Sequence, residues 1–214
     1  MNHLEKHEVL AVLKIAREQS ELDWLLFTFQ YIPSHRISEV LTLTPENFDG
    51  GFVTVQRMKG SLKTTQPLVT HEEPLLNERP AIDALVRRLR PDERLFGTLT
   101  KQNANYRFAK YAKQTGLPKH KRHTHCLRHS RAMHTIKTAG IENVRQLCGH
   151  ASIASTGYYL GSAMPLHGPL WALGQAYRLE DGQRATDWRN YAKQYQFNFL
   201  GLRPEELARC QQGN

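Results

Sequence analysis

Helical periodicity runs through most of this chain and is interrupted once, by a segment with the pattern of a β-hairpin. Helices are predicted over residues 4–17, 21–31, 82–89 and 103–115. Residues 52–57 and 64–69 instead have the composition of two short strands, and the Lys-Gly-Ser sequence at 59–61 marks the turn between them. The sequence therefore predicts a mainly α fold with a small antiparallel β-sheet or hairpin, an α+β class.

The charge balance indicates a polyanionic partner. The 214 residues include 29 Lys and Arg against 20 Asp and Glu, a formal net charge of +9. This excess favours nucleic acid first and an anionic membrane surface second. No apolar run approaches the roughly 20 residues that span a bilayer, and the amino terminus lacks the apolar core of a signal peptide. We therefore expect no membrane partner and a cytoplasmic location. The three cysteines, Cys126, Cys148 and Cys210, are an odd number without paired spacing, which agrees with a reducing compartment.

Side chains suited to phosphate chemistry concentrate in residues 122–160. His125 and Arg128 are three residues apart, so a helix beginning just before them would place both on one face. A guanidinium offers a planar fork of donors to two phosphate oxygens, and an imidazole exchanges a proton near neutrality. His150 and Tyr159 follow. Together these residues supply a fixed cation, a proton carrier, a neutral donor and a nucleophile, the parts of a phosphoryl-transfer site.

Two segments of this stretch resemble the C-terminal motifs of the tyrosine recombinases, the phage integrase family. They are HCLRHSRA, from His125, and LCGHASIASTGYY, from Leu147. In that family a His-x-x-Arg pair is followed by a Leu-Gly-His segment, and the nucleophilic tyrosine comes nine residues after that histidine. Counting nine residues from His150 reaches Tyr159, which makes Tyr158 its packing neighbour.

The upstream part of the chain resembles the same family. HRISEVLTL is similar to the family's Arg-x-x-Glu helix, so the resemblance implies Arg36 as the first catalytic arginine and Glu39 as its supporting carboxylate. In the family a lysine on a β-hairpin, usually eight residues before a Pro-Leu pair, supplies the remaining catalytic group. Lys59 has that spacing to Pro67, whereas Lys63 does not. Five matches in the expected order make a specific signal, although each alone would be weak.

The chain departs from the family pattern in two motifs and in length. Ser34-His35 stand where the family usually has a glycine before the first arginine, and Cys148 replaces a more usual leucine. We interpret both as packing variation. The family's arm-binding and core-binding domains have no room here, so we expect either a catalytic-domain fragment or a small single-domain member. Residues 1–160 are then the catalytic domain, and 161–214 a helical tail that either packs in cis or is exchanged between protomers.

The resemblance implies a site-specific DNA recombinase that cuts and rejoins DNA through a covalent 3′-phosphotyrosine. The implied roles are Tyr159 as nucleophile, Arg36, Arg128 and His150 as stabilisers of the phosphate charge, His125 as the aid to tyrosine deprotonation, and Lys59 as the proton donor to the leaving 5′-oxygen. Because the covalent intermediate conserves the energy of the broken phosphodiester bond, no cofactor and no metal are implied. The implied partners are double-stranded DNA and further copies of the chain, as a tetramer on DNA or a monomer when free.

The basic loop before His125 is a predicted DNA contact. Lys119, Lys121 and Arg122 would meet the phosphate backbone, and a solvated surface loop is the alternative. The region is also rich in histidine. It lacks a recognised zinc spacing and a carboxylate that could complete a hydrolytic site, so no metal is predicted.

Two other functions stay open at this point. A type IB topoisomerase uses similar chemistry without partner strands, and a DNA-binding regulator could keep the fold without turnover. The intact motif set disfavours the regulator, because a binder has no use for a correctly spaced tyrosine. Taken singly, Arg36 could be a surface ion-pair partner of Glu39, and His125, His150 and Tyr159 could each be structural.

Overall fold

The computed structural model describes residues 3–57, 61–68, 70–153, 155–157 and 159. By its internal contacts the chain divides into two units, Met1–Thr156 and Gly157–Asn214. Of the second, the described residues are Gly157 and Tyr159, and the predicted tail, 161–214, lies outside the described part.

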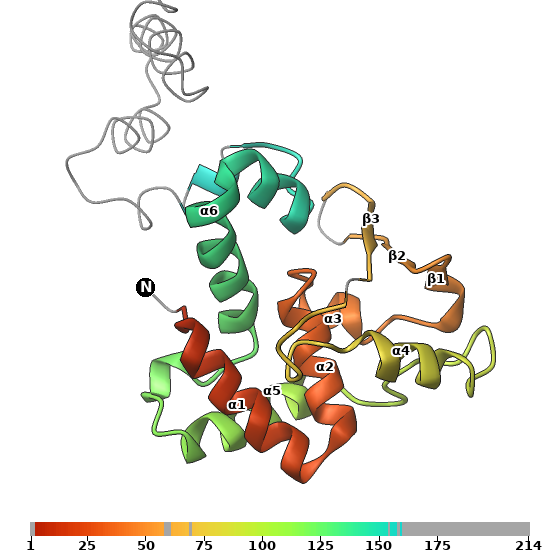
Figure 1. Cartoon of the computed structure of the whole chain (residues 1–214), viewed down its shortest axis with the longest axis horizontal. Helices are drawn as coiled ribbons and strands as arrows, with labels where there is room; N and C mark the ends of the chain where they lie inside the picture. Colours follow the sequence, from red (N-terminus) through yellow and green to blue (C-terminus); the bar gives the residue numbers. More distant parts are fainter. Residues whose placement is uncertain (1–2, 58–60, 69, 154, 158, 160–214) are drawn as a thin grey trace, which may run out of the picture. The chain divides into compact units, whose positions relative to one another are not determined.

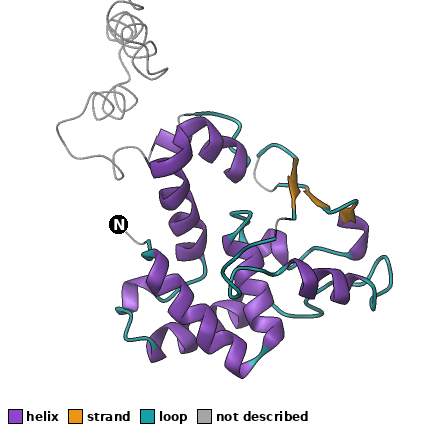
Figure 2. Ribbon diagram, viewed as in Figure 1, coloured by secondary structure: helices purple, strands orange, loops and turns teal. Residues whose placement is uncertain are grey.

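Helices make up most of the described secondary structure, and the strands form one small sheet (Figures 1 and 2). The elements in chain order are α1 (Lys6–Gln19), α2 (Glu21–Tyr31), α3 (Ile37–Val40), the 3-10 turn η1 (Pro45–Asn47), β1 (Phe48–Asp49), β2 (Phe52–Val55), β3 (Thr64–Pro67), α4 (Arg79–Val86), α5 (Lys101–Gln114), the 3-10 turn η2 (Lys119–Lys121) and α6 (His125–Cys148). The predicted class, mainly α with a small antiparallel sheet, is confirmed.

Helix α2 is the centre of the hydrophobic core. Every residue from Asp23 to Tyr31 is buried, because α1, α3 and α6 pack around this helix. Its first turn is capped by the Ser20 hydroxyl, which accepts a hydrogen bond from the Asp23 amide at 3.2 Å. The Asp23 carboxylate in turn accepts hydrogen bonds from Arg107 at 2.8 Å and from the Tyr111 hydroxyl at 2.6 Å. These bonds tie α2 to α5.

A buried turn connects α2 to the short helix α3. Ser34, fully buried in this turn, has a left-handed backbone with φ 56°, a conformation that glycine adopts most easily. Arg36 is the N-cap residue of α3, and the Glu39 carboxylate accepts a hydrogen bond from the Arg36 amide at 2.8 Å. The residue at this position therefore affects the backbone conformation of the turn into α3 as well as the packing around it.

The sheet has the order β1-β2-β3 and is antiparallel throughout. The hairpin β2–β3 lies where the sequence predicts it, with Val53 opposite Gln66 and Val55 opposite Thr64. Val53 and Val55 face the core, in keeping with the alternation of a half-buried strand. The two-residue strand β1 was not predicted, because two residues are too few to show an alternating pattern.

Helix α6 carries the central sequence stretch through 24 residues. It bends at Gly140, where φ is 79° and ψ 175°, and it ends at Gly149, whose left-handed φ of 66° stops the helix. The predicted start near Thr124 is confirmed: the Thr124 amide and hydroxyl both donate to the Asn105 side-chain oxygen, at 3.1 and 2.9 Å. This anchors the beginning of α6 to α5.

Candidate active site

Two arginines share one buried carboxylate at the start of α3. The Glu39 side chain is inaccessible to solvent, and its Oε1 accepts a hydrogen bond from Arg36 at 2.7 Å while its Oε2 accepts one from Arg57 at 3.0 Å. The Arg36 side chain remains 24% exposed, and its Nη2 also donates to the Ser61 hydroxyl at 3.3 Å. Glu39 thus orients Arg36 with one oxygen, while the Arg36 side chain stays partly exposed.

Arg128 lies in the first turn of α6 and is buried. Its guanidinium donates to the Ser34 carbonyl, to the Cys148 carbonyl at 2.8 Å, and contacts the Nε2 atom of His150 at 3.2 Å. These contacts join the turn before α3, the start of α6 and the end of α6. Arg128 is therefore a structural link as well as a fixed cation.

His150 has protein partners for both ring nitrogens. Because Arg128 can only donate, Nε2 must accept, so the neutral ring carries its proton on Nδ1 and donates it to the Thr156 hydroxyl at 3.0 Å. Desolvation, followed by the positive charges of Arg128, Arg36 and neighbouring arginines, lowers the pKa of His150 to about 4. The ring is therefore neutral at physiological pH.

His125 is exposed at the first position of α6, and its ring meets that of His129 edge to face at 4.3 Å between centroids. Desolvation of the ring, and then the positive potential of nearby side chains that include Arg128 and Arg36, lowers the pKa of His125 to about 4. A neutral imidazole at pH 7 can accept a proton, which is the protonation state that a general base needs.

Four of the six predicted catalytic residues come together in this part of the protein. Arg128 contacts His150 at 3.2 Å and donates to the carbonyl of Ser34, two residues before Arg36. The positive charges of Arg36 and Arg128 both lower the pKa of His125 and of His150. Their positive fields overlap in a region suited to an anion such as a phosphodiester.

The two remaining predicted residues are not placed in this cluster. Lys59 lies outside the described residues, in the gap at 58–60. Tyr159 belongs to the second unit, Gly157–Asn214. Their catalytic roles stay predictions.

The three basic residues predicted to bind DNA differ in their surroundings. Lys121 pairs with the Glu8 carboxylate at 3.0 Å, and Arg122 donates to the Leu117 carbonyl at 2.6 Å. Lys119 is exposed. Two of the three therefore have partners within the chain, and Lys119 has the side chain best placed to reach a ligand.

Arg57 is a member of this cluster that the sequence reading missed. It is buried, and besides Glu39 it contacts the Thr64 hydroxyl at 2.8 Å and the Leu147 carbonyl at 2.9 Å. A signal was present: Val53, Val55 and Arg57 follow one another at every second position, so Arg57 continues the buried face of β2.

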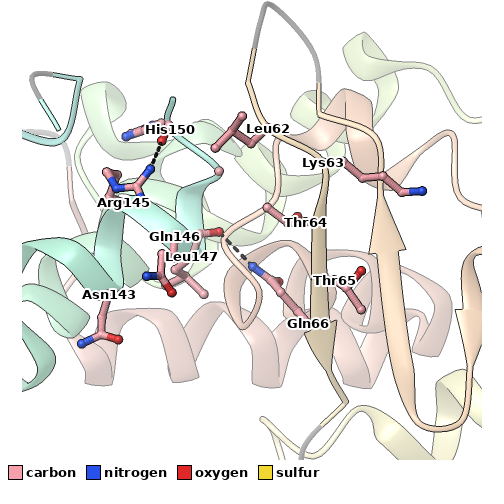
Figure 3. Close-up of a pocket in the computed structure, with 11 residues that line it drawn as sticks. Leu62, Lys63, Thr64, Thr65, Gln66, Asn143, Arg145, Gln146, Leu147 and His150 are labelled. Carbon is pink, nitrogen blue, oxygen red and sulfur yellow. Dashed lines mark hydrogen bonds between the residues drawn. The ribbon is translucent and has the colours of Figure 1, made fainter. Parts of the chain in front are cut away.

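A cavity of about 420 Å³ opens beside the cluster, between β3 and the end of α6. Most of the residues that line it are of polar or basic type; they are Leu62, Lys63, Thr64, Thr65, Gln66, Asn143, Arg145, Gln146, Leu147, Gly149 and His150. Figure 3 shows Arg145 donating to the His150 carbonyl, at 2.9 Å, and Gln66 donating to the Leu147 carbonyl, at 3.0 Å. Lys63 points away from His150 in this view.

No group of three or more His, Cys, Asp or Glu side chains within the described ranges is arranged to hold a metal ion. In the histidine-rich region, Cys126 Sγ lies 3.2 Å from His123 Nε2. Among the described helices, none is long and apolar enough to cross a membrane.

The fold is that of an integrase catalytic domain. Similar solved structures include a lambda integrase dimer bound to a core site (TM-score 0.62, 18% identity, 74% of this chain and 47% of that one), the XerH recombinase in a post-cleavage complex (0.59, 19%, 76% and 50%) and the catalytic domain of bacteriophage HP1 integrase (0.56, 21%, 84% and 95%). At these identities the likeness concerns the fold. This chain spans about half the length of the DNA-bound lambda integrase and XerH chains.

The sequence profile of the phage integrase family matches residues 2–165. The chain belongs to the phage integrase family, and the resemblance inferred from the motifs is confirmed. No curated protein matches its sequence.

Proposed function

We propose that this chain is a site-specific DNA recombinase that cuts and rejoins double-stranded DNA through a 3′-phosphotyrosine intermediate. The observation that carries the proposal is the position of Arg128, which contacts His150 and donates to the turn that leads into Arg36. Two guanidinium groups on one anion are the arrangement that stabilises charge developing on phosphate oxygens. Membership of the phage integrase family agrees with this chemistry.

In the proposed reaction, the Tyr159 oxygen attacks the phosphorus of a DNA phosphodiester. A bond forms between tyrosine and phosphorus, the bond to the 5′-oxygen breaks, and Lys59 gives that oxygen a proton. The tyrosine proton passes to His125, which is neutral at physiological pH and becomes a stronger base once a bound phosphate offsets the positive charges that lower its pKa. Attack by the 5′-hydroxyl of another strand reverses the steps and releases the enzyme.

His150 must change its hydrogen bonds if it is to serve the phosphate as a donor. In the structure its Nε2 faces Arg128 and its Nδ1 proton faces Thr156. A phosphate held by the arginines would offset the positive charge that lowers the pKa of His150. Proton uptake at Nε2 would then supply a donor directed toward that phosphate.

We further propose a cytoplasmic protein that assembles on DNA as a tetramer. Lambda integrase has been solved as a dimer on a core site and as a tetramer on a Holliday junction. Residues 1–160 would form the catalytic domain, and the 161–214 segment would either pack in cis or be exchanged between protomers.

An adduct assay tests the proposed function. Nicked duplexes tiled across the DNA that flanks the gene are incubated with the full chain, and products that resist denaturation by SDS are separated. We expect a covalent protein–DNA adduct with the wild type and with Tyr158→Phe, and none with Tyr159→Phe. An adduct that persists in Tyr159→Phe and disappears in Tyr158→Phe would assign the nucleophile to the neighbouring residue. DNA binding without any adduct would favour the regulator.

A further inference from the structure

The Arg57 guanidinium uses all three of its nitrogen atoms on three different segments of the chain. Nη1 donates to Glu39 of α3 at 3.0 Å, Nη2 to the Leu147 carbonyl of α6 at 2.9 Å, and Nε to the Thr64 hydroxyl of β3 at 2.8 Å. The side chain is inaccessible to solvent. A lysine could not replace these contacts, because its single ammonium cannot reach three separated acceptors with the geometry of a planar fork.

Each of these segments leads to a predicted catalytic residue. Helix α3 follows Arg36, and the end of α6 leads to His150. The hairpin carries Lys59 between Arg57 and Ser61, and its far side is also tied to the site. Arg36 donates to the Ser61 hydroxyl at 3.3 Å, and the next amide along the chain donates to the Gly149 carbonyl at 3.1 Å. Both ends of the lysine-bearing segment are thus attached to the same two elements.

Burial of the charged Arg57 side chain is energetically unfavourable. Desolvation lowers the pKa of Arg57, and repulsion from Arg128 adds to the effect, with Glu39 opposing it. Gly149 leaves the space that the side chain occupies, since a Cβ there would lie 3.0 Å from Arg57 Cγ and 3.1 Å from its Nε. An aliphatic residue would continue the apolar face of β2 without such a cost, so the position calls for a role beyond packing.

We propose that Arg57 is a positioning residue that fixes the Lys59 hairpin against the Arg36–His150 cluster, so that the lysine can protonate the leaving 5′-oxygen. This inference rests on the proposed function. Arg57 acts through Lys59 and touches no reacting atom. Removing its contacts should therefore slow the step that needs a proton donor, and should spare a reaction in which the leaving group needs no proton.

A sulfur-substituted substrate separates these two cases. The probes are a nicked duplex that the wild type cleaves and the same duplex with sulfur in place of the bridging 5′-oxygen. A thiolate leaves without protonation, because thiols ionise near pH ~8.5, whereas alcohols ionise only at far higher pH. Single-turnover adduct formation is measured at saturating protein, together with DNA affinity and melting temperature.

We expect Arg57→Lys to cleave the oxygen substrate at least about tenfold more slowly than the wild type, and the sulfur substrate at a rate within about threefold of it. DNA affinity should stay within about threefold, since the residue does not meet solvent. Thr64→Val removes one Arg57 contact with little change of shape and should show the same pattern more weakly. Thr65→Val is the matched control: it removes a neighbouring hydroxyl on β3 that faces Thr54 at 2.9 Å instead.

Equal losses on both substrates in Arg57→Lys and Thr64→Val would overturn the inference, because the defect would then lie outside the proton transfer. Unchanged rates on both would overturn it as well. If Arg57→Lys fails to fold, the comparison of Thr64→Val with Thr65→Val decides by the same criterion. A wild type that forms no adduct with any duplex of the tiled set overturns the proposed function itself, which is distinct from loss in the variants alone.

Discussion

The fit between Gly149 and Arg57 can be measured by adding one methyl group. Gly149→Ala places a Cβ 3.0 Å from Arg57 Cγ, 3.1 Å from its Nε and 3.1 Å from Thr64 Cγ2, at a left-handed φ of 66°. Gly97→Ala makes the same change at φ 58° with nothing within 4 Å of the new Cβ. The two variants share the backbone strain, and only the first adds crowding around Arg57.

The expected losses follow from these two contributions. A residue with a Cβ at left-handed φ loses roughly 1–2 kcal/mol of unfolding free energy. Alanine also lowers the entropy of the unfolded chain, and this effect is equal in the two variants. Crowding in a packed region adds about 1–3 kcal/mol. We therefore expect Gly149→Ala to lose at least about 1 kcal/mol more unfolding free energy than Gly97→Ala, or about 2–4 °C in melting temperature for each kcal/mol.

Chemical denaturation of the wild type and both variants measures this difference. Adduct formation by the two variants gives a second reading, because displacement of Arg57 should slow Gly149→Ala and leave Gly97→Ala unaffected. Equal stability losses would refute the reasoning, since they would mean that Arg57 and Thr64 yield to the methyl group without resistance. A larger loss in Gly97→Ala would refute it more strongly.

Three further predictions concern other parts of the cluster and the core. The pKa of His150 is about 4 in the fold and ~6.5 in an unfolded chain, so the unfolded state binds more protons between these pH values. The unfolding free energy should therefore fall as the pH drops from about 6.5 to 4. In denaturation curves, His150→Gln should make the unfolding free energy depend less on pH in this range. Tyr111→Phe, which removes the 2.6 Å bond to the buried Asp23 carboxylate, should cost about 1.5–3 kcal/mol of unfolding free energy, and a loss below about 0.5 would contradict the assigned bond. Arg36→Lys should slow adduct formation roughly 100-fold or more with little change in melting temperature, because its side chain is partly exposed; a rate near that of the wild type would remove Arg36 from the reaction.

The sequence predicted the elements that depend on local pattern. Helix α2, from Glu21 to Tyr31, is found with the predicted bounds, because Ser20 caps its start and the Ile32-Pro33 sequence follows its end. The β2–β3 hairpin also lies where alternating residues and a Lys-Gly-Ser turn place it. These features are set within a few neighbouring residues, and a single sequence contains that information.

Contacts between distant segments could not be predicted in the same way. The motif spacing identified Arg128 as a cation, but not its bonds to the carbonyls of Ser34 and Cys148, which depend on how the α2–α3 turn meets the end of α6. The contacts of Arg57 could not be predicted either, because the sequence placed this residue only at the end of the first strand of the hairpin. Its partners lie 18 and 90 positions away in the chain.

The backbone conformation at Ser34 could not be predicted from the residue type alone. From the sequence, a serine in place of glycine was interpreted as packing variation. The backbone at Ser34 has a positive φ of 56°, so this residue keeps the turn that a glycine would form most easily. Its carbonyl accepts from Arg128, which makes the turn a direct neighbour of the cluster.

The positive charges around Glu39 favour the binding of an anion. The guanidinium groups of Arg36 and Arg57 both contact that carboxylate, and Arg128 adds a third positive charge close by. An anion held among these arginines would relieve their mutual repulsion. Binding of the anion would therefore raise the unfolding free energy of the protein. A polyanionic ligand would then act as a counter-ion to this cluster, and the melting temperature of the protein would rise with the ligand concentration.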